Sequence, residues 1–345
     1  MSGSLPVAPP PVSVCVPTFN RAALLRTSLA SILRQSFRDF ELIVVDDAST
    51  DETPGVVAGL REPRLRYERN ERNLGQIANL NRCLALARGE YVCIFHDDDV
   101  YAPTILEREV AVLARHPGVG LVHTAVWMLT ADGRVRRVHR VAERDYVRSG
   151  RERFMTYLGR AHDIVFSTAM VRRACYEAVG GFDPRFILAD GDMWLRIALR
   201  ADIAYIAEPL AGYRVHDVSA SRTMTPARWF GEYFEIFDKN VALAGSSFPV
   251  QVPALLAEAR RVQAQRSRVE AAASIAAGRF DLAADYIAVA AGLDASPLGR
   301  ASDALLCLCR NPLGRAALRA VRAVRQRIHR ATFDREIRSG KVLLK

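Results

Sequence analysis

Lysine is scarce in this 345-residue chain, which places it only at Lys239, Lys341 and Lys345. The formal net charge of +10 therefore comes from arginine. Such a composition reflects either a codon bias or an anionic partner such as a nucleotide, a nucleic acid or a lipid headgroup. The placement of the charge along the chain has to decide between these readings.

Cysteine is also sparse, and its pattern excludes a disulfide framework. Cys15 and Cys93 stand inside apolar runs that are typical of buried strands, so we expect reduced core thiols. Cys307 and Cys309 are closely spaced but lack the second ligand pair of a structural zinc site.

Long apolar runs and a targeting segment are missing too. The run from Gly118 to Thr130 falls short of the roughly 20 apolar residues that span a bilayer. Residues 1–11 have no basic stretch followed by an apolar one, so we expect a flexible N-terminal tail. These absences predict a cytoplasmic protein that is soluble or peripheral at the inner face of the membrane.

Several common enzyme motifs are absent as well. The sequence contains no phosphate-binding P-loop, no G-x-G-x-x-G fingerprint, no G-x-S-x-G elbow and no H-E-x-x-H pair. These absences argue against P-loop, dinucleotide-binding, serine-hydrolase and zinc-peptidase chemistry.

Strand-like and helix-like segments alternate over residues 12–225. This rhythm predicts an α/β domain with a largely parallel sheet covered by helices. The expected strands are Val12–Val16, Glu41–Val45, Leu65–Glu68, Tyr91–Phe95, Leu121–Leu129 and Ile164–Val171.

Residues 226–345 lose the β-branched runs and show helical periodicity, so we expect a separate helical region. Ala272–Pro297 has the residue spacing of one tetratricopeptide-like helix pair. Leu313–Arg330 has the pattern of a basic amphipathic helix. This helix either contacts an anionic membrane or docks on the catalytic domain.

Acidic residues follow two of the expected strands, where open α/β sheets bind their ligands. Asp97, Asp98 and Asp99 would repel one another without a cation or hydrogen-bond donors, which favours a divalent metal. The alternative is a solvated turn in which Asp99 caps the next helix. At Asp46 and Asp47, a carboxylate could accept a hydrogen bond from a nucleobase, although helix capping by Ser49 or Thr50 also explains the polar run.

Taken together, these motifs resemble glycosyltransferase family 2, which has the GT-A fold. The resemblance covers about Val12 to Ser221. It rests on Val14–Arg21, Leu42–Asp51, Asn73-Leu74-Gly75, Asn79-Leu80-Asn81, Gly89-Glu90-Tyr91, His96–Asp99, Gly180–Asp183, Asp190–Arg196 and His216.

The resemblance implies an inverting, metal-dependent transfer of a sugar from a nucleotide diphosphate to an acceptor hydroxyl, as in polysaccharide or glycan synthesis. It makes Asp190 the catalytic base. It places Asp98, Asp99 and His216 at Mn²⁺ or Mg²⁺, and Asp192, Trp194 and Arg196 in an acceptor-binding or orienting segment. A core role explains Trp194 at least as well. The donor-binding residues are Pro17, Thr18, Asn20, Arg21, Asp46, Asp47, Asn79 and Asp97.

Two other classes of function compete with this interpretation. A nucleotidyltransferase or phosphohydrolase also holds a metal on aspartates at strand ends. A non-enzymatic protein that binds an anionic ligand would use the basic charge. Much of that charge lies beyond Arg310 without interleaved aromatic residues, so we do not expect nucleic-acid binding. The expected partners are instead a nucleotide sugar, a glycan or lipid-linked acceptor, and an anionic membrane.

Overall fold

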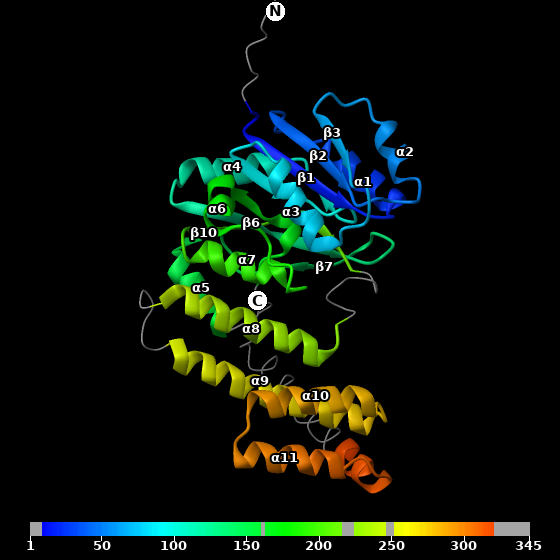
Figure 1. The fold of residues 1–345 in the computed structure, drawn as a ribbon, viewed down its shortest axis with the longest axis vertical. Helices are drawn as coiled ribbons and strands as arrows, with labels where there is room; N and C mark the ends of the chain where they lie inside the picture. The colour runs from blue at the N-terminus through cyan, green and yellow to red at the C-terminus, as the bar shows by residue number, and fades with distance from the viewer. Residues whose placement is uncertain (1–8, 160–162, 216–223, 246–251, 321–345) are drawn as a thin grey trace, which may run out of the picture. The chain divides into compact units, whose positions relative to one another are not determined.

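The computed structural model describes residues 9–159, 163–215, 224–245 and 252–320 (Figure 1). The chain divides into two compact units. Unit 1 contains Met1–Thr223 and Glu235–Pro249, and unit 2 contains Met224–Phe234 and Val250–Lys345. The helix that follows the boundary expected at residue 225 therefore contributes to both units.

A mixed sheet with the strand order β3-β2-β1-β4-β9-β6-β10-β5 forms the centre of unit 1, with β7 beside β6 and β8 beside β10. The strands are β1 (Val12–Thr18), β2 (Phe40–Asp46), β3 (Leu65–Arg69), β4 (Tyr91–Ile94), β5 (Val100–Tyr101), β6 (Val119–Leu129), β7 (Val135–His139), β8 (Tyr146–Arg148), β9 (Met170–Arg172) and β10 (Asp202–Arg214).

The first four strands are parallel, as the alternation of segments predicts. β1, β2 and β4 are buried almost along their whole length because both faces of the sheet are covered, whereas β3, with the sequence LRYER, is polar and partly exposed at the edge. Val14 packs in one core cluster with Leu25 and Leu29 of α1 (Ala22–Ile32), on one face of the sheet. Cys15 points to the other face, where its thiol lies 3.5 Å from the carbonyl oxygen of Cys83 in α3 (Gln76–Leu86). Parallel pairing brings the carboxyl ends of β1, β2 and β4 to one edge of the sheet.

The second half of the sheet mixes the two directions. β9 is antiparallel to β4 and β6, whereas β10 is parallel to β6 and antiparallel to β5 and β8. The strand expected over Ile164–Val171 is wrong for most of its length, because Phe166–Thr168 form a 3₁₀ helix, η1. The side chain of Thr168 donates to the carbonyl oxygen of Val165 at 2.8 Å, a local bond that competes with strand pairing.

Helices flank the sheet and make up the described part of unit 2. In unit 1 these are α1, α2 (Thr53–Ala58), α3, α4 (Ile105–Arg115), α5 (Gly150–Gly159), α6 (Arg173–Val179) and α7 (Ala189–Ala198); α8 (Pro226–Ala244) belongs to both units, and α9 (Val252–Ala276), α10 (Phe280–Leu293) and α11 (Pro297–Leu308) to unit 2.

Within unit 2, the expected helix pair over Ala272–Pro297 falls on α9 and α10. The guanidinium of Arg268 holds this unit together by pairing with Asp294 and Asp303, each at 2.8 Å. Residues 312–320 are helical, and the rest of the basic helix expected over Leu313–Arg330 lies outside the described residues. None of the helices that the structure describes combines the length and apolar composition needed to cross a membrane.

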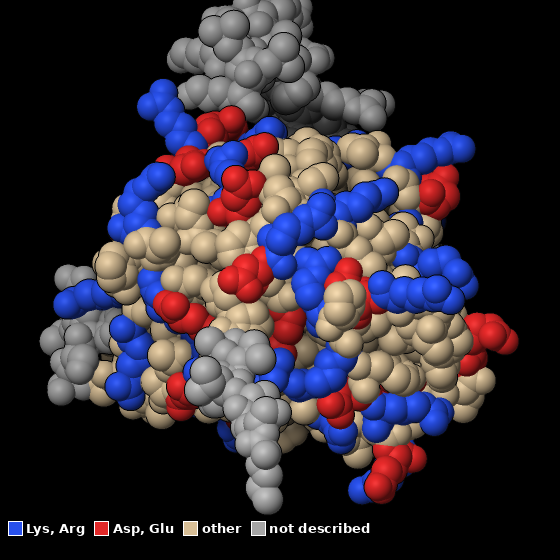
Figure 2. All heavy atoms as spheres, turned by 90° about the horizontal axis from the view of Figure 1, so that it is seen from above, with Lys and Arg blue, Asp and Glu red and all other residues tan. Residues whose placement is uncertain are grey.

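Positive charge does not gather in one place on the face of the molecule shown in Figure 2. There, lysine and arginine side chains alternate with aspartate and glutamate side chains. A nucleic-acid backbone requires a basic groove or patch. This face therefore gives no support to the nucleic-acid alternative.

Candidate active site

The carboxyl ends of β1 and β4 meet in a cluster of charged side chains. Arg21, just after β1, donates from Nη1 to Asp98 Oδ2 at 2.7 Å and to Asp97 Oδ1 at 3.1 Å. The hydroxyl of Thr18 donates to Asp97 Oδ2 at 2.7 Å. The structure thus brings together three residues that the sequence assigns to the donor and one that it assigns to the metal.

Electrostatics in this cluster favour added positive charge. Burial, together with the charge of Asp98, raises the pKa of Asp97 to about 6, against the opposing effects of Arg21 and Thr18. Burial would lower the pKa of Arg21, but the two carboxylates outweigh it and raise this pKa. Arg21 therefore balances only part of the negative charge.

Asp99 is nearly inaccessible, at 1% exposure, and it is held by other elements. It accepts a hydrogen bond from the hydroxyl of Ser167 at 2.5 Å and another from the backbone N–H of Arg214 at 2.8 Å. Helix α4 begins after Thr104, so the alternative of Asp99 as its cap is wrong. Burial and the charge of Asp98 raise the pKa of Asp99 to about 8.

His96, Asp98 and Asp99 together have the geometry of a metal site. One ligand atom from each residue lies within 4.8 Å of the others. Burial lowers the pKa of His96, which favours the neutral imidazole that can act as a ligand. Carboxylates suit Mg²⁺ and Mn²⁺, so these residues fit the implied ion. His216, the third predicted ligand, lies outside the described residues.

Asp47 anchors the loop before α3. Its carboxylate accepts hydrogen bonds from the backbone N–H groups of Leu74 at 2.8 Å and Gly75 at 2.9 Å, and from the amide of Asn70 at 2.7 Å. Gly75 has a φ of +85°, which favours glycine at this turn. A carboxylate has about four acceptor sites, so Asp47 can still accept one nucleobase hydrogen bond.

Asp46 and Asn79 lie in the same layer but face inward. Asp46 is fully buried and accepts from the hydroxyl of Tyr67 at 2.5 Å and the N–H of Ser49 at 2.8 Å. Asn79 is 3% exposed, and its amide donates to the carbonyl oxygen of Val45 at 3.0 Å. Both side chains thus hold the strand end in place, and their direct contact with the donor stays a prediction.

The two loops after β1 and β2 are joined to each other. Asn20 has a φ of +53°, and its side-chain oxygen accepts from the N–H of Thr50 at 2.7 Å. The backbone N–H of Asn20 donates to the hydroxyl of Ser49 at 2.9 Å. Pro17 pairs in register with Val45 within β1 and β2. These contacts fix the positions of the two loops, where the donor is expected to bind, relative to each other.

Asp190 stands in the first turn of α7 and is half-buried. Its charge acts on the imidazole of His96, so the predicted base lies near the acidic motif. The ring of Phe166 links the same elements, with centroids 5.2 Å from His96 and 5.6 Å from Trp194.

Trp194 does not form an acceptor-binding surface. Its side chain is 0% exposed, so no face of the ring is open for a sugar to stack on. Of the two roles expected for Trp194, core packing therefore accounts for its burial, and stacking on the acceptor does not.

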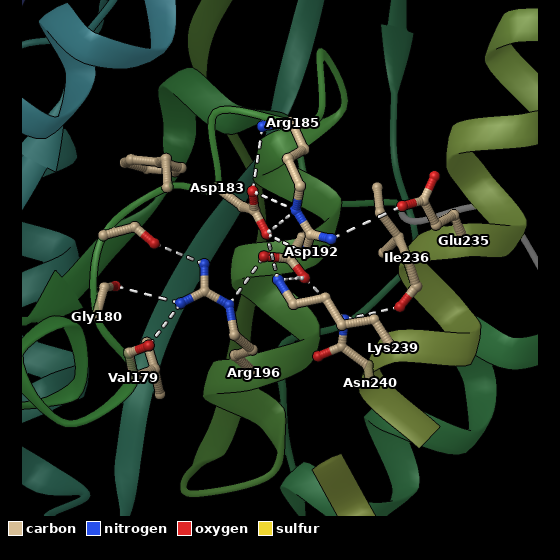
Figure 3. Close-up of polar contacts among 12 residues, drawn as sticks. Val179, Gly180, Asp183, Arg185, Asp192, Arg196, Glu235, Ile236, Lys239 and Asn240 are labelled. Carbon is tan, nitrogen blue, oxygen red and sulfur yellow. Dashed lines mark hydrogen bonds and ion pairs between the residues drawn. The ribbon is translucent and has the colours of Figure 1, made fainter. Parts of the chain in front are cut away.

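Asp192 and Arg196 form the centre of a polar network between α7, the turn before it and α8 (Figure 3). Arg196 donates to Asp192 at 2.9 Å and to the carbonyl oxygens of Val179 and Gly181 at 2.6 and 2.8 Å. This geometry agrees with an orienting role for both residues.

Sequence reasoning missed several residues that shape the site. Ser167 and Arg214 hold Asp99, and Lys239 pairs with Asp192. Asn81 both donates to and accepts from the backbone of Phe182, at 2.9 and 2.7 Å. One signal could have revealed Lys239, since it is the only lysine before Lys341.

An α/β sheet with acidic residues at the ends of parallel strands, and an aspartate at a nearby helix start, is the arrangement expected of a GT-A transferase. The family model described as "Glycosyl transferase family 2" matches residues 13–180. An uncharacterized protein of Mycobacterium tuberculosis is 32% identical over 233 residues, which cover 64% of this chain and 72% of that protein. The chain belongs to glycosyltransferase family 2 and is a glycosyltransferase.

Two further proteins extend the comparison. The GalNAc(5)-diNAcBac-PP-undecaprenol beta-1,3-glucosyltransferase of Campylobacter jejuni is 38% identical over 117 residues, or 33% of this chain and 37% of that enzyme. The crystal structure of Staphylococcus aureus TarS 1–349 in complex with UDP-GlcNAc matches 90% of this chain and 91% of its own, with a TM-score of 0.63 and 22% identity. This likeness confirms the predicted GT-A architecture with its helical C-terminal region.

Proposed function

We propose that this glycosyltransferase moves a sugar, with inversion, from a nucleoside diphosphate sugar to an acceptor hydroxyl during polysaccharide or glycan synthesis. One observation carries the proposal: Arg21 and Thr18 donate to the acidic motif at Asp97 and Asp98, and the charge of Asp190 acts on His96 in that same motif. The site thus joins groups suited to a diphosphate with a carboxylate suited to an acceptor hydroxyl.

Asp190 acts as the general base in this proposal and takes the proton of the attacking hydroxyl. A base of this kind must lie within about 3 Å of that hydroxyl in the complex. Arg21 balances charge beside the diphosphate, and Asp47 accepts from the nucleobase while it holds the Asn70–Gly75 loop. Asp98, with Asp99, His96 and His216, would hold Mn²⁺ or Mg²⁺, which as a bound Lewis acid neutralises charge on the leaving diphosphate.

A binding screen followed by product analysis tests this assignment. Nucleotide sugars with Mn²⁺ or Mg²⁺ should raise the melting temperature of the wild-type protein, and the D98A variant should lose the metal-dependent part of the shift. Turnover should release a nucleoside diphosphate together with a glycosylated acceptor. Release of inorganic phosphate, or formation of a nucleotidylated product, would instead indicate the phosphohydrolase or nucleotidyltransferase alternative.

The acceptor is a lipid-linked glycan at the inner face of the membrane in this proposal. The Campylobacter relative carries undecaprenol in the name of its substrate. On α11, Leu298, Leu305 and Leu308 lie on one stripe and are 83%, 61% and 72% exposed. Leu313 is 84% exposed, and Arg310 and Arg319, which follow α11 in the sequence, are exposed as well. Exposed leucines flanked by arginines suit an anionic bilayer surface.

Vesicle co-sedimentation tests the membrane contact. The full-length protein should pellet with phosphatidylserine-containing vesicles but not with phosphatidylcholine vesicles. The double variant L305D/L308D should stay in the supernatant. L243D alters an equally exposed leucine on α8 and serves as the matched control. Equal pelleting of both variants would contradict the membrane proposal.

A further inference from the structure

The carboxylate of Asp192 is fully buried and is surrounded by donors from two helices. Arg196 of the same helix donates to Oδ2, and two residues of α8 approach Oδ1, with Asn240 Nδ2 at 2.9 Å and Lys239 Nζ at 2.8 Å (Figure 3). A buried carboxylate of this kind is stable only with such partners. The first turn of α7 is therefore tied to α8.

Lys239 also holds the turn that leads into α7. Its ammonium lies 2.9 Å from Asp183 Oδ2, so it bridges two carboxylates (Figure 3). Arg185 and Lys239 hold the pKa of Asp183 well below its usual range. Because Arg196 anchors the backbone at Val179 and Gly181, the segment from residue 179 to residue 192 is fixed at its start, middle and end.

Helix geometry connects this network to the predicted base. Asp190 and Asp192 are two positions apart, which on an α-helix corresponds to a rotation of about 200°. Asp192 faces α8, and Asp190 lies on the opposite side, where it influences His96. The contacts of α8 with Asp192 therefore fix the rotation of the first turn of α7 and, with it, the direction in which Asp190 points.

We propose that Lys239 is a positioning residue for sugar transfer, which acts by bridging Asp183 and Asp192 and so aiming Asp190. This inference rests on the proposed function. Lysine suits the position because its compact ammonium can approach two carboxylates at once, whereas the planar guanidinium of arginine favours one bidentate partner. In a chain that uses arginine almost throughout, lysine occurs at this bridging position. The part of α8 that carries Lys239 belongs to the same unit as the sheet.

The variant K239M removes the charge while keeping most of the length of the side chain. A displacement of the base of about 1 Å costs roughly 100-fold in rate, so we expect kcat to fall by about that factor. The KM for the nucleotide sugar and the affinity for the nucleoside diphosphate should stay within about twofold, because the donor residues lie on other elements. E235Q, one turn earlier on α8, is the matched control. The Glu235 carboxylate lies 3.9 Å from Arg185 Nη1 and both side chains are about 60% exposed, so this ion pair contributes little and E235Q should retain wild-type kcat.

Two more variants separate positioning from general destabilisation. K239R keeps the positive charge, so its kcat should be at least about tenfold higher than that of K239M. Should K239M fail to fold, N240A removes a donor to Asp192 but keeps the ammonium, and it should lower kcat alone. A kcat in K239M equal to that in E235Q would overturn the inference. So would a parallel loss of donor affinity.

Hydrogen–deuterium exchange supplies a readout that does not need turnover. Amides of residues 183–193 should exchange faster in K239M than in the wild type or E235Q, while those of β1 and β4 should be unchanged. If K239M exchanges faster but the wild-type protein transfers no sugar, the result supports the bridging contacts of Lys239 and overturns the proposed function. Unchanged exchange would overturn the bridge itself.

Discussion

Arg21 and Asp98 form a direct ion pair, with Nη1 and Oδ2 2.7 Å apart. The arginine is about one-third exposed and the carboxylate about one-tenth, so the pair lies at the rim of the site rather than in the core. Arg21 is thus placed to balance the acidic motif and to meet an incoming diphosphate.

The variant R21Q should weaken donor binding without unfolding the protein. Hydrogen bonds to charged groups contribute about 1.5–3 kcal/mol, so we expect the Kd for the nucleotide sugar to rise by about 10- to 100-fold. Isothermal titration with a nucleotide sugar and Mn²⁺ measures this change. R26Q, which alters an exposed arginine on α1, is the control, and equal affinities in the two variants would contradict the role of Arg21.

D190N should abolish transfer while leaving the donor site intact. General base catalysis contributes about 10²- to 10⁴-fold, so kcat should fall by at least that range. The melting-temperature shift caused by nucleotide sugar and metal should match that of the wild type. Near-normal turnover in D190N would remove Asp190 as the base. D132N, at an exposed turn in unit 1, controls for the change of charge.

The strand ends and their acidic motifs could be predicted because both can be recognised from residues that are adjacent in the sequence. Val14 and Val44 lie in apolar runs that only a buried strand explains, and parallel pairing then brings Asp47 and Asp98 to one edge. The prediction of an α/β sheet with a helical C-terminal region is confirmed for this reason. Antiparallel β9 is different, because the alternation of strands and helices predicts parallel pairing only, and η1 replaces most of the strand expected there.

Roles that depend on burial could not be predicted in the same way. Trp194 follows the acidic residues of α7 as an acceptor-binding aromatic would, yet helix periodicity does not show that its face of α7 is closed. Asn79 was expected at the donor from its place in the motif, and the sequence alone does not show that its amide donates to the carbonyl oxygen of Val45. Lys239 lies far along the chain from Asp183 and Asp192, and only the packing of α8 brings them together.

D47A should affect both the stability of the protein and its affinity for the nucleobase. It leaves the backbone N–H of Leu74 without its acceptor, which costs about 1–3 kcal/mol of unfolding free energy, whereas the N–H of Gly75 keeps Asn73 Oδ1 at 2.9 Å. If Asp47 also accepts from the nucleobase, the affinity for nucleoside diphosphate should fall more than the affinity for inorganic pyrophosphate. Equal losses for both ligands would leave Asp47 with an anchoring role alone. Urea unfolding and competition binding measure the two effects.

Glu109 in α4 should make the folded state less stable at alkaline pH. It is 0% exposed, and within the described residues neither carboxylate oxygen has a hydrogen-bond partner. Burial raises its pKa well above the usual value, so the folded state holds the proton that the unfolded chain releases. Its contribution to stability is therefore present below about pH 4.5 and is lost as the pH rises towards the folded-state pKa.

The variant E109Q removes this titration and should flatten the pH dependence. Between pH 6.5 and 8.5 the wild type should lose up to about 1.4 kcal/mol per pH unit relative to E109Q, until the folded-state pKa is reached. The titration of His123 does not fall in this window. Burial lowers the pKa of His123 to about 3, so the folded state loses stability through His123 only as the pH falls below about 6.5. Urea unfolding at several pH values measures the difference, and parallel curves for the two proteins would show that Glu109 is not buried as a neutral acid.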